Sequence, residues 1–145
     1  MGAVQLSADG GAAEANAELV RRLHRELLAA RDPEVARGFF APDFVSHNNP
    51  PGFPSGVEGV TRFFAMLGAA FPDVEVTVDE LFAAGDRVAV ATTFTGTHEG
   101  ELMGLAPTGR RVAVTGIDLL RIAEGRIAEH RGLTDTVGLM RQLGG

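Results

Sequence analysis

The spacing of hydrophobic residues changes once along this 145-residue chain, and that change constrains the fold more than any other feature. Before Phe71-Pro72-Asp73, apolar residues recur every three or four positions, as in Leu19, Val20, Leu23 and Leu27, which predicts amphipathic helices. After it, β-branched residues alternate with polar ones, which predicts strands. The chain is therefore expected to pack helices against one face of a sheet.

Three helices are predicted in the first half of the chain. The first covers about residues 15–30. The second begins after Asp32 and runs to Phe40, because Asp-Pro-Glu combines an N-cap with proline at the first helical position. The spacing of Ser55 and Glu58 predicts a capping box at the start of the third helix.

The remaining segments predict one α+β domain over residues 14–145. A brief extended segment is expected at 44–47, followed by a proline-rich loop at 48–55. Further strands are expected at 74–78, 88–98, 111–122 and 126–133, with a long glycine-containing loop at 99–110. A terminal helix is expected at 134–143. The predicted architecture is a cone in which N-terminal helices pack on a curved, mainly antiparallel sheet and enclose a pocket. Residues 1–13 are expected to form a flexible N-terminal segment.

Composition narrows the chemistry that such a pocket can perform. The chain contains no Cys, Lys, Tyr or Trp, which removes thiolate catalysis, lysine Schiff bases and tyrosine oxyanion donors. The net charge of −6, with cations spread along the chain, argues against nucleic acid as a partner. No apolar run approaches the ~20 residues that span a bilayer, and the start lacks a signal-peptide pattern, so no membrane partner and a cytoplasmic location are expected. The remaining Asp, Glu, His and Arg side chains suit proton transfer.

The register of the last hairpin determines which of these groups meet. A two-residue turn pairs Asp118 with Arg131 on the same side of the hairpin. Alternation from Arg131 through Leu133 then brings Asp135 to that side. His130 is expected to point the other way, unless a bulge reverses the assignment.

The two aspartates each allow a structural and a catalytic interpretation. Asp135 is either an acid/base or only the N-cap of the terminal helix. Asp118 lies between Ile117 and Leu119, which suggests a buried strand, where it serves catalysis or forms a structural ion pair with Arg131.

The other candidates also allow alternatives. His130 is a site residue or a surface and interface residue, and His98 either contacts substrate or hydrogen-bonds the following loop. His47 either polarises a substrate carbonyl or orders its loop together with Asn48. The phenylalanines are mostly expected in the core, with Phe64 as a candidate for lining the pocket. No pair of histidines has the spacing of a metal site, so no metal is expected.

Several ordered fragments carry a resemblance to a known family. They are Ala70-Phe71-Pro72-Asp73, His47-Asn48, Gly96-Thr97-His98 followed by Gly100-Glu101 and Pro107-Thr108-Gly109, Gly116-Ile117-Asp118, Gly125-Arg126-Ile127 followed by Glu129-His130, and Asp135 with the ending Gly138-Leu139-Met140. In this order they resemble a signature of the SnoaL-like polyketide cyclases, within the NTF2-like superfamily, over nearly all of residues 16–145.

The resemblance implies a cone that is a homodimer or homotetramer and works without a metal or cofactor. Founding members close a polyketide ring by an intramolecular aldol reaction, with an Asp near the final strand as acid/base, and Asp135 is the position that matches it. The family often carries Trp after Glu-His, whereas this chain has Arg131, which implies a more polar pocket.

The leading hypothesis is therefore a cofactor-free acid–base enzyme acting on a hydrophobic, polyketide-like carbonyl compound. The expected catalytic residues are Asp135, Asp118, His130 and His47, and the expected substrate contacts are Arg131, His98, Asn48, Phe64 and Leu133. The same residue types also fit an isomerase, dehydratase, hydratase or epoxide hydrolase. A third hypothesis is a binding or dimerisation module without chemistry.

Overall fold

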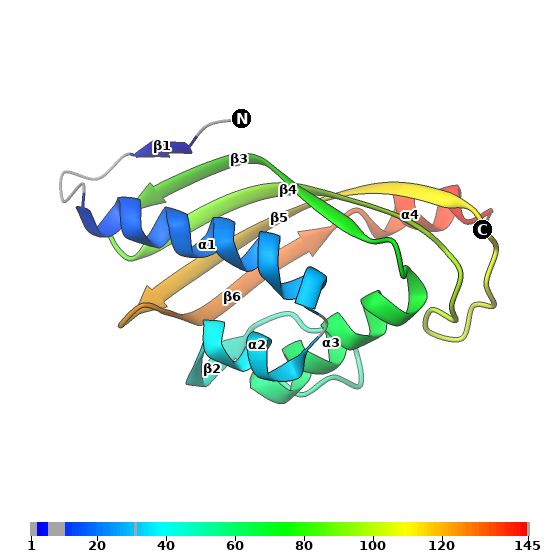
Figure 1. Cartoon of the computed structure of the whole chain (residues 1–145), viewed down its shortest axis with the longest axis horizontal. Coiled ribbons are helices and arrows are strands. Elements are labelled where there is room, and N and C mark those ends of the chain that lie inside the picture. Colours follow the sequence, from blue (N-terminus) through cyan, green and yellow to red (C-terminus); the bar gives the residue numbers. More distant parts are fainter. Residues whose placement is uncertain (1–2, 6–10, 31, 145) are drawn as a thin grey trace.

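The computed structural model describes residues 3–5, 11–30 and 32–144 and has the expected α+β architecture (Figure 1). In chain order its elements are β1 (Ala3–Gln5), α1 (Gly11–Ala30), α2 (Pro33–Phe39), β2 (Phe40–Ser46), α3 (Val57–Ala70), β3 (Glu75–Ala84), β4 (Arg87–Thr97), β5 (Arg111–Ala123), β6 (Arg126–Thr134) and α4 (Thr136–Gln142). The predicted flexible segment over 1–13 lies partly outside the described residues, and its described parts belong to β1 and α1.

The six strands form one sheet in the order β1-β3-β4-β5-β6-β2. The four central strands are antiparallel neighbours, as their hairpin turns predict. At the two edges, β1 joins β3 and β2 joins β6 in parallel, so both edges are formed by strands from the N-terminal part of the chain.

Helices cover one face of this sheet, which we call the inner face, and the opposite face is the outer face. On α1, Ala13, Ala17, Val20, Leu23 and Leu27 recur at helical spacing and are buried in the core. In Figure 1, α1 runs along the sheet, α2 and α3 lie next to each other, and α4 lies by the N-terminal end of β5. Within the described ranges, no helix is long and apolar enough to cross a membrane.

Of the N-caps predicted for the second and third helices, one is confirmed and the other is wrong. Asp32 caps α2 by accepting a hydrogen bond of 2.9 Å from the backbone N–H of Glu34. The capping box expected from Ser55 is not formed, because Gly56 is the N-cap of α3 and gives it no side-chain hydrogen bond. The Ser55 carbonyl instead accepts the Ser46 N–H at 2.7 Å, which ties the loop to the end of β2.

A β-bulge makes the predicted register of the last hairpin wrong. Ile122 pairs with Ile127 next to the turn, but Arg121 pairs with Glu129, so Ala128 is an extra residue in β6. The extra residue shifts every later pair by one position and turns the following side chains to the opposite face.

The bulge changes the partners of Asp118. It pairs with Gly132, not with Arg131, which pairs with Leu119 on the outer face. His130 joins Asp118 on the inner face, so the expected face shared by Asp118, Arg131 and Asp135 does not form.

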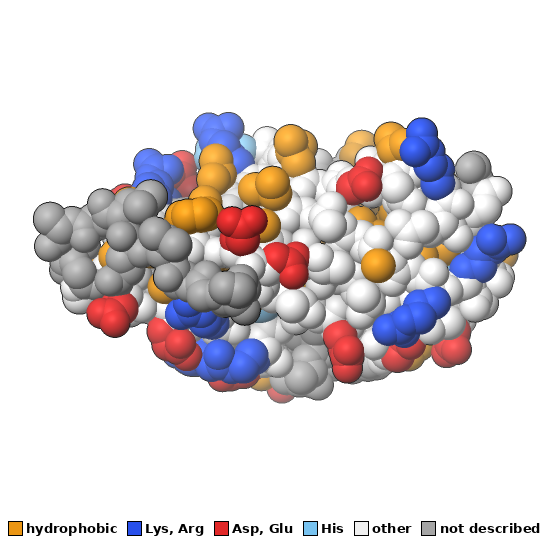
Figure 2. Space-filling model, turned by 90° about the horizontal axis from the view of Figure 1, so that it is seen from above, with side chains coloured by type: hydrophobic (Ala, Val, Ile, Leu, Met, Phe, Trp, Pro, Cys, Tyr) orange, Lys and Arg blue, Asp and Glu red, His pale blue; other side chains and the backbone are white. Residues whose placement is uncertain are grey.

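The outer face of the sheet exposes large hydrophobic side chains. Leu133 is 78% exposed, Ile117 is 60% exposed and Leu119 is 53% exposed, and Phe82 on β3 adds to them. Figure 2 shows one face of the molecule on which hydrophobic side chains gather with acidic side chains beside them.

Candidate active site

The inner face of the sheet is apolar at both ends and polar in the middle. One core cluster contains Val90 and Leu120, and the other contains Val112 and Val114. Between the two clusters lie positions with small or polar side chains on neighbouring strands, namely Thr92, Gly116, Asp118, Gly132 and Thr134. We call this stretch, where small and polar side chains interrupt the apolar core, the polar gap.

Three polar side chains form a hydrogen-bonded chain across three strands at this gap. His130 on β6 contacts Asp118 on β5, with 2.7 Å between Nε2 and Oδ1. The other ring nitrogen, Nδ1, lies 2.9 Å from Oγ of Ser46 on β2. The side chains of Asp118 and His130 are each 29% exposed, whereas Ser46 is only 5% exposed. Solvent can therefore reach the carboxylate and the imidazole, but not the serine hydroxyl.

The order of these contacts differs from that of a hydrolytic triad. In serine hydrolases the serine contacts Nε2 of the histidine and the aspartate contacts Nδ1. Here the two partners are exchanged, and the buried Ser46 hydroxyl is not presented to solvent. The arrangement thus fits proton transfer by the carboxylate better than nucleophilic attack by the serine.

Gly132 provides the space in which Asp118 and His130 meet. A Cβ atom at this position would overlap the Asp118 carboxylate and lie 2.6 Å from Nε2 of His130. Any side chain there would push the two groups apart, so the contact requires glycine.

Asn48 anchors the loop after β2 to the same strand. Its side-chain Nδ2 donates to the Gly132 carbonyl, and its Oδ1 accepts the Gly132 N–H at 3.0 Å. The amide therefore pairs with the backbone as a further strand residue would. This geometry agrees with the loop-ordering interpretation rather than with substrate contact.

The His47 side chain lies on the opposite face of the sheet from the hydrogen-bonded Asp118, His130 and Ser46. Its Nε2 is 3.1 Å from Oε2 of Glu129, whose Oε1 lies 2.6 Å from Nε of Arg121. The hydrogen bond from Arg121, assisted by His47, lowers the pKa of Glu129 to about 2. His47 is thus engaged in a surface charge cluster rather than placed beside Asp118.

His98 is fully buried beneath the loop that follows β4. Thr108 approaches Nδ1 with both its backbone N–H, at 3.2 Å, and its hydroxyl, at 3.0 Å. The ring stacks at a tilt on Phe71, and its Nε2 has no hydrogen-bond partner among the described residues. His98 therefore organises residues 98–110, which was one of its two predicted roles. The start of this loop is also held by Asp73, whose pKa is lowered by hydrogen bonds from the backbone and side chain of Thr97.

Asp135 is exposed and caps α4. Its Oδ1 accepts the Gly138 N–H at 2.8 Å, as expected for an N-cap. The two residues expected to lie with it, Arg131 and Leu133, are exposed on the outer face. Of the four expected catalytic residues, the structure thus brings together only Asp118 and His130.

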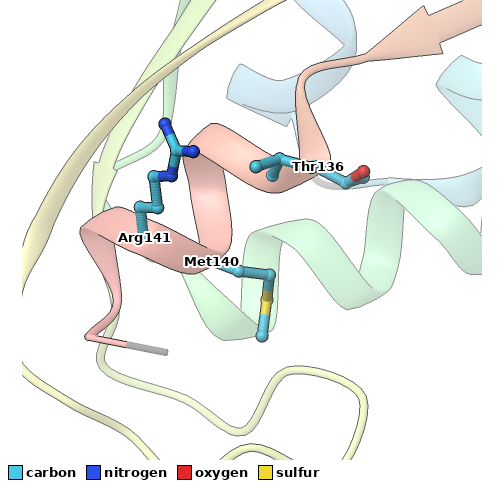
Figure 3. Close-up of a pocket in the computed structure, with 4 residues that line it drawn as sticks. Thr136, Met140 and Arg141 are labelled. Atoms are coloured by element: carbon cyan, nitrogen blue, oxygen red, sulfur yellow. The ribbon is translucent and has the colours of Figure 1, made fainter.

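Two surface hollows lie away from this pair. One, of about 220 Å³, lies among α1, α2 and α3, and Phe64 is part of its lining. The other is a shallow hollow on α4 lined by Thr136, Val137, Met140 and Arg141, where the side chains of Met140 and Arg141 point to different sides of the helix (Figure 3).

Sequence reasoning missed Ser46 and Gly132. The only signal for Ser46 was its place next to His47 in an extended segment, and no residue pattern marked the bulge that brings His130 to it. In the part of the chain that the structure describes, no group of three or more His, Asp or Glu side chains is arranged to hold a metal ion.

Comparison with known proteins identifies the family of this chain. Residues 18–143 match the family described as SnoaL-like polyketide cyclase. A relative named aklanonic acid methyl ester cyclase DnrD, from Streptomyces peucetius, is 30% identical over 135 residues, which are 88% of this chain and 89% of the relative. Another, named nogalonic acid methyl ester cyclase, from Streptomyces nogalater, is 32% identical over 114 residues, 73% of this chain and 81% of the relative. The solved structure of TsrD from Streptomyces laurentii matches with a TM-score of 0.77 and 28% identity, covering 92% of this chain and 96% of that one.

Proposed function

Because this chain belongs to the SnoaL-like polyketide cyclase family, we propose that it closes a ring in a polyketide methyl ester, with Asp118 as the acid/base. The names of its relatives, which are aklanonic and nogalonic acid methyl ester cyclases, support this substrate class. The single observation that carries the assignment is the partly exposed Asp118–His130 pair in the polar gap of the inner face.

The free oxygen of Asp118 performs the proton transfers. Oδ1 is bound to His130, and among the described residues Oδ2 has no hydrogen-bond partner. Oδ2 removes a proton from the carbon next to a substrate carbonyl, and the resulting enolate attacks a second carbonyl of the same molecule. The protonated carboxyl then returns the proton to the new alkoxide. The product is an isomer of the substrate, and no water, metal or redox step is needed.

This proposal moves the acid/base role from Asp135 to Asp118. Asp135 is occupied in capping α4 and is exposed, whereas Asp118 faces the gap between the two core clusters. The partial burial of Asp118 lowers the number of water molecules that compete for the carboxylate, which favours proton exchange between carbon and carboxylate.

Exchanging each aspartate for asparagine tests the assignment. Asp118→Asn removes the base and is expected to lower turnover about 10²- to 10⁴-fold. Asp135→Asn is the matched control, since asparagine also caps helices, and should keep turnover near that of the wild type. The assay follows aklanonic acid methyl ester by liquid chromatography and mass spectrometry in H₂¹⁸O, with an isomeric product free of ¹⁸O expected. Full turnover in Asp118→Asn, or its loss in Asp135→Asn, would contradict the proposal.

We also propose that the working form is a homodimer joined through the outer face. Exposed Ile117, Leu119 and Leu133 form an apolar area that favours burial against a partner. The charges at its borders complement a second copy, because exposed Glu80 lies on β3 and exposed Arg131 lies on β6. A two-fold axis parallel to the strands would place β3 of one protomer over β6 of its partner. Glu80 of each protomer would then face the Arg131 side of the other.

A further inference from the structure

We propose that Ser46 is a positioning residue for this reaction, because its buried hydroxyl holds His130 in the tautomer that carries the proton on Nε2, facing Asp118. The proposal rests on the proposed function of Asp118. Ser46 lies 2.9 Å from Nδ1 of His130 and does not touch the gap where substrate would bind, so it acts through the histidine.

The directions of the two hydrogen bonds follow from the chemistry of the partners. An ionised carboxylate only accepts, so in the 2.7 Å contact Nε2 of His130 donates to Asp118. In a neutral imidazole the other nitrogen is then an acceptor. The Ser46 hydroxyl, which has a proton to give, donates to Nδ1. Both contacts therefore favour the same tautomer.

The backbone holds Ser46 in this place. Ser46 pairs with His130 in the parallel register of β2 and β6, so the two side chains leave the sheet side by side. The Ser46 N–H is bound to the Ser55 carbonyl at 2.7 Å, and the next residue, His47, donates its N–H to the His130 carbonyl at 2.9 Å. Backbone hydrogen bonds on both sides thus fix the distance between the hydroxyl and the ring.

The burial of Ser46 makes its hydroxyl hard to replace by water. The residue is 5% exposed, so an alanine there would leave Nδ1 of His130 facing a methyl group. A buried acceptor without a donor is unfavourable, and the ring would relieve it by turning or by moving its proton to Nδ1. Either change takes the N–H away from Asp118 and leaves the carboxylate without its fixed orientation.

Nitrogen-15 NMR of the imidazole rings reads the tautomer directly. Long-range ¹H–¹⁵N correlation spectra distinguish the two tautomers, and loss of one signal set in His130→Gln assigns the His130 resonances. The wild type is expected to show the Nε2–H form. Ser46→Ala is expected to show a mixture of the two tautomers, whereas Ser46→Thr, which keeps the hydroxyl, should restore the Nε2–H form.

Kinetics with aklanonic acid methyl ester provides the second measurement. Ser46→Ala should lower kcat about 10-fold and change KM less than twofold, because the hydroxyl orients the catalytic group and does not contact substrate. Ser46→Thr should recover most of kcat. Ser55→Ala is the matched control, since Ser55 is exposed and contributes its backbone carbonyl to Ser46, and it should change neither quantity.

The two measurements separate failure of this proposal from failure of the proposed function. An Nδ1–H tautomer in the wild type, or an unchanged tautomer and kcat in Ser46→Ala, would overturn the positioning role even if Asp118→Asn is inactive. Covalent labelling of Ser46 by a fluorophosphonate would overturn it as well, because that result makes the serine a nucleophile. Full activity in Asp118→Asn would remove the proposed function and would leave the tautomer measurement valid.

Discussion

Asp118 and His130 can meet because residue 132 is a glycine and has no side chain. Gly132 has its backbone bound by the Asn48 amide and its Cα directed at the pair. This glycine is therefore required by a close approach of two side chains rather than by an unusual backbone angle, and its φ is not in the left-handed region. The requirement becomes visible only after the strand partners of Asp118 are known.

Gly132→Ala is expected to separate the carboxylate from the imidazole. The added methyl overlaps Asp118 and His130, so turnover should fall roughly 10²-fold through misplacement of the base. Stability should also fall, by about 1–3 kcal/mol as in other overpacked sites. Turnover and urea denaturation measure the two effects. Gly38→Ala in α2 is the control, because outside its own helix backbone no described atom lies within 4 Å of the added methyl, so activity and stability should not fall. A fully active Gly132→Ala enzyme would show that the close contact is not needed.

Elements were predictable from local patterns, whereas the pairing between them was not. The N-cap at Asp32 and the turn at Glu124-Gly125 follow from residues that act within a few positions, and the structure has both. The bulge at Ala128 depends on how β6 packs between β5 and β2, and nothing in its own sequence distinguishes it from a regular strand. That one extra residue decided which histidine joined Asp118.

Asp135 acts locally, because it is the N-cap that stabilises α4. Its carboxylate satisfies the Gly138 N–H at the start of α4, so Asp135→Ala should lower the free energy of unfolding by about 1 kcal/mol. Turnover per folded molecule should stay within about twofold, because α4 still docks through Gln142, whose amide pairs with the backbone of Ala113. Urea denaturation and turnover at a temperature far below the midpoint separate stability from catalysis. A large loss of turnover with unchanged stability would return the catalytic role to Asp135.

At the scale of the whole molecule, the two faces of the sheet have different roles. The inner face combines two apolar clusters with a polar gap, and the outer face exposes leucine and isoleucine side chains at its centre. The alternation of hydrophobic residues predicted that a two-faced sheet would form, and helix periodicity predicted which elements cover one face. Neither pattern could predict that Leu133 and Arg131 belong to the outer face, since the orientation of these side chains follows from the bulge.

Leu119→Arg tests whether the outer face joins two copies of the chain. Leu119 lies at the centre of the apolar area beside Arg131, so a new cation there would be buried against the apolar surface of the partner and lie close to the same substitution on the second protomer. Light scattering should give twice the chain mass of 15.2 kDa for the wild type and a single chain mass for Leu119→Arg. The residue is already 53% exposed within one protomer, so the variant should fold as a monomer with helix and strand content unchanged by circular dichroism. Met103→Arg is the matched control, because Met103 is 63% exposed in the loop between β4 and β5, outside the strands of the sheet, and its variant should remain a dimer. A wild-type mass of one chain would exclude the dimer, and a dimeric Leu119→Arg variant would place the interface elsewhere on the molecule.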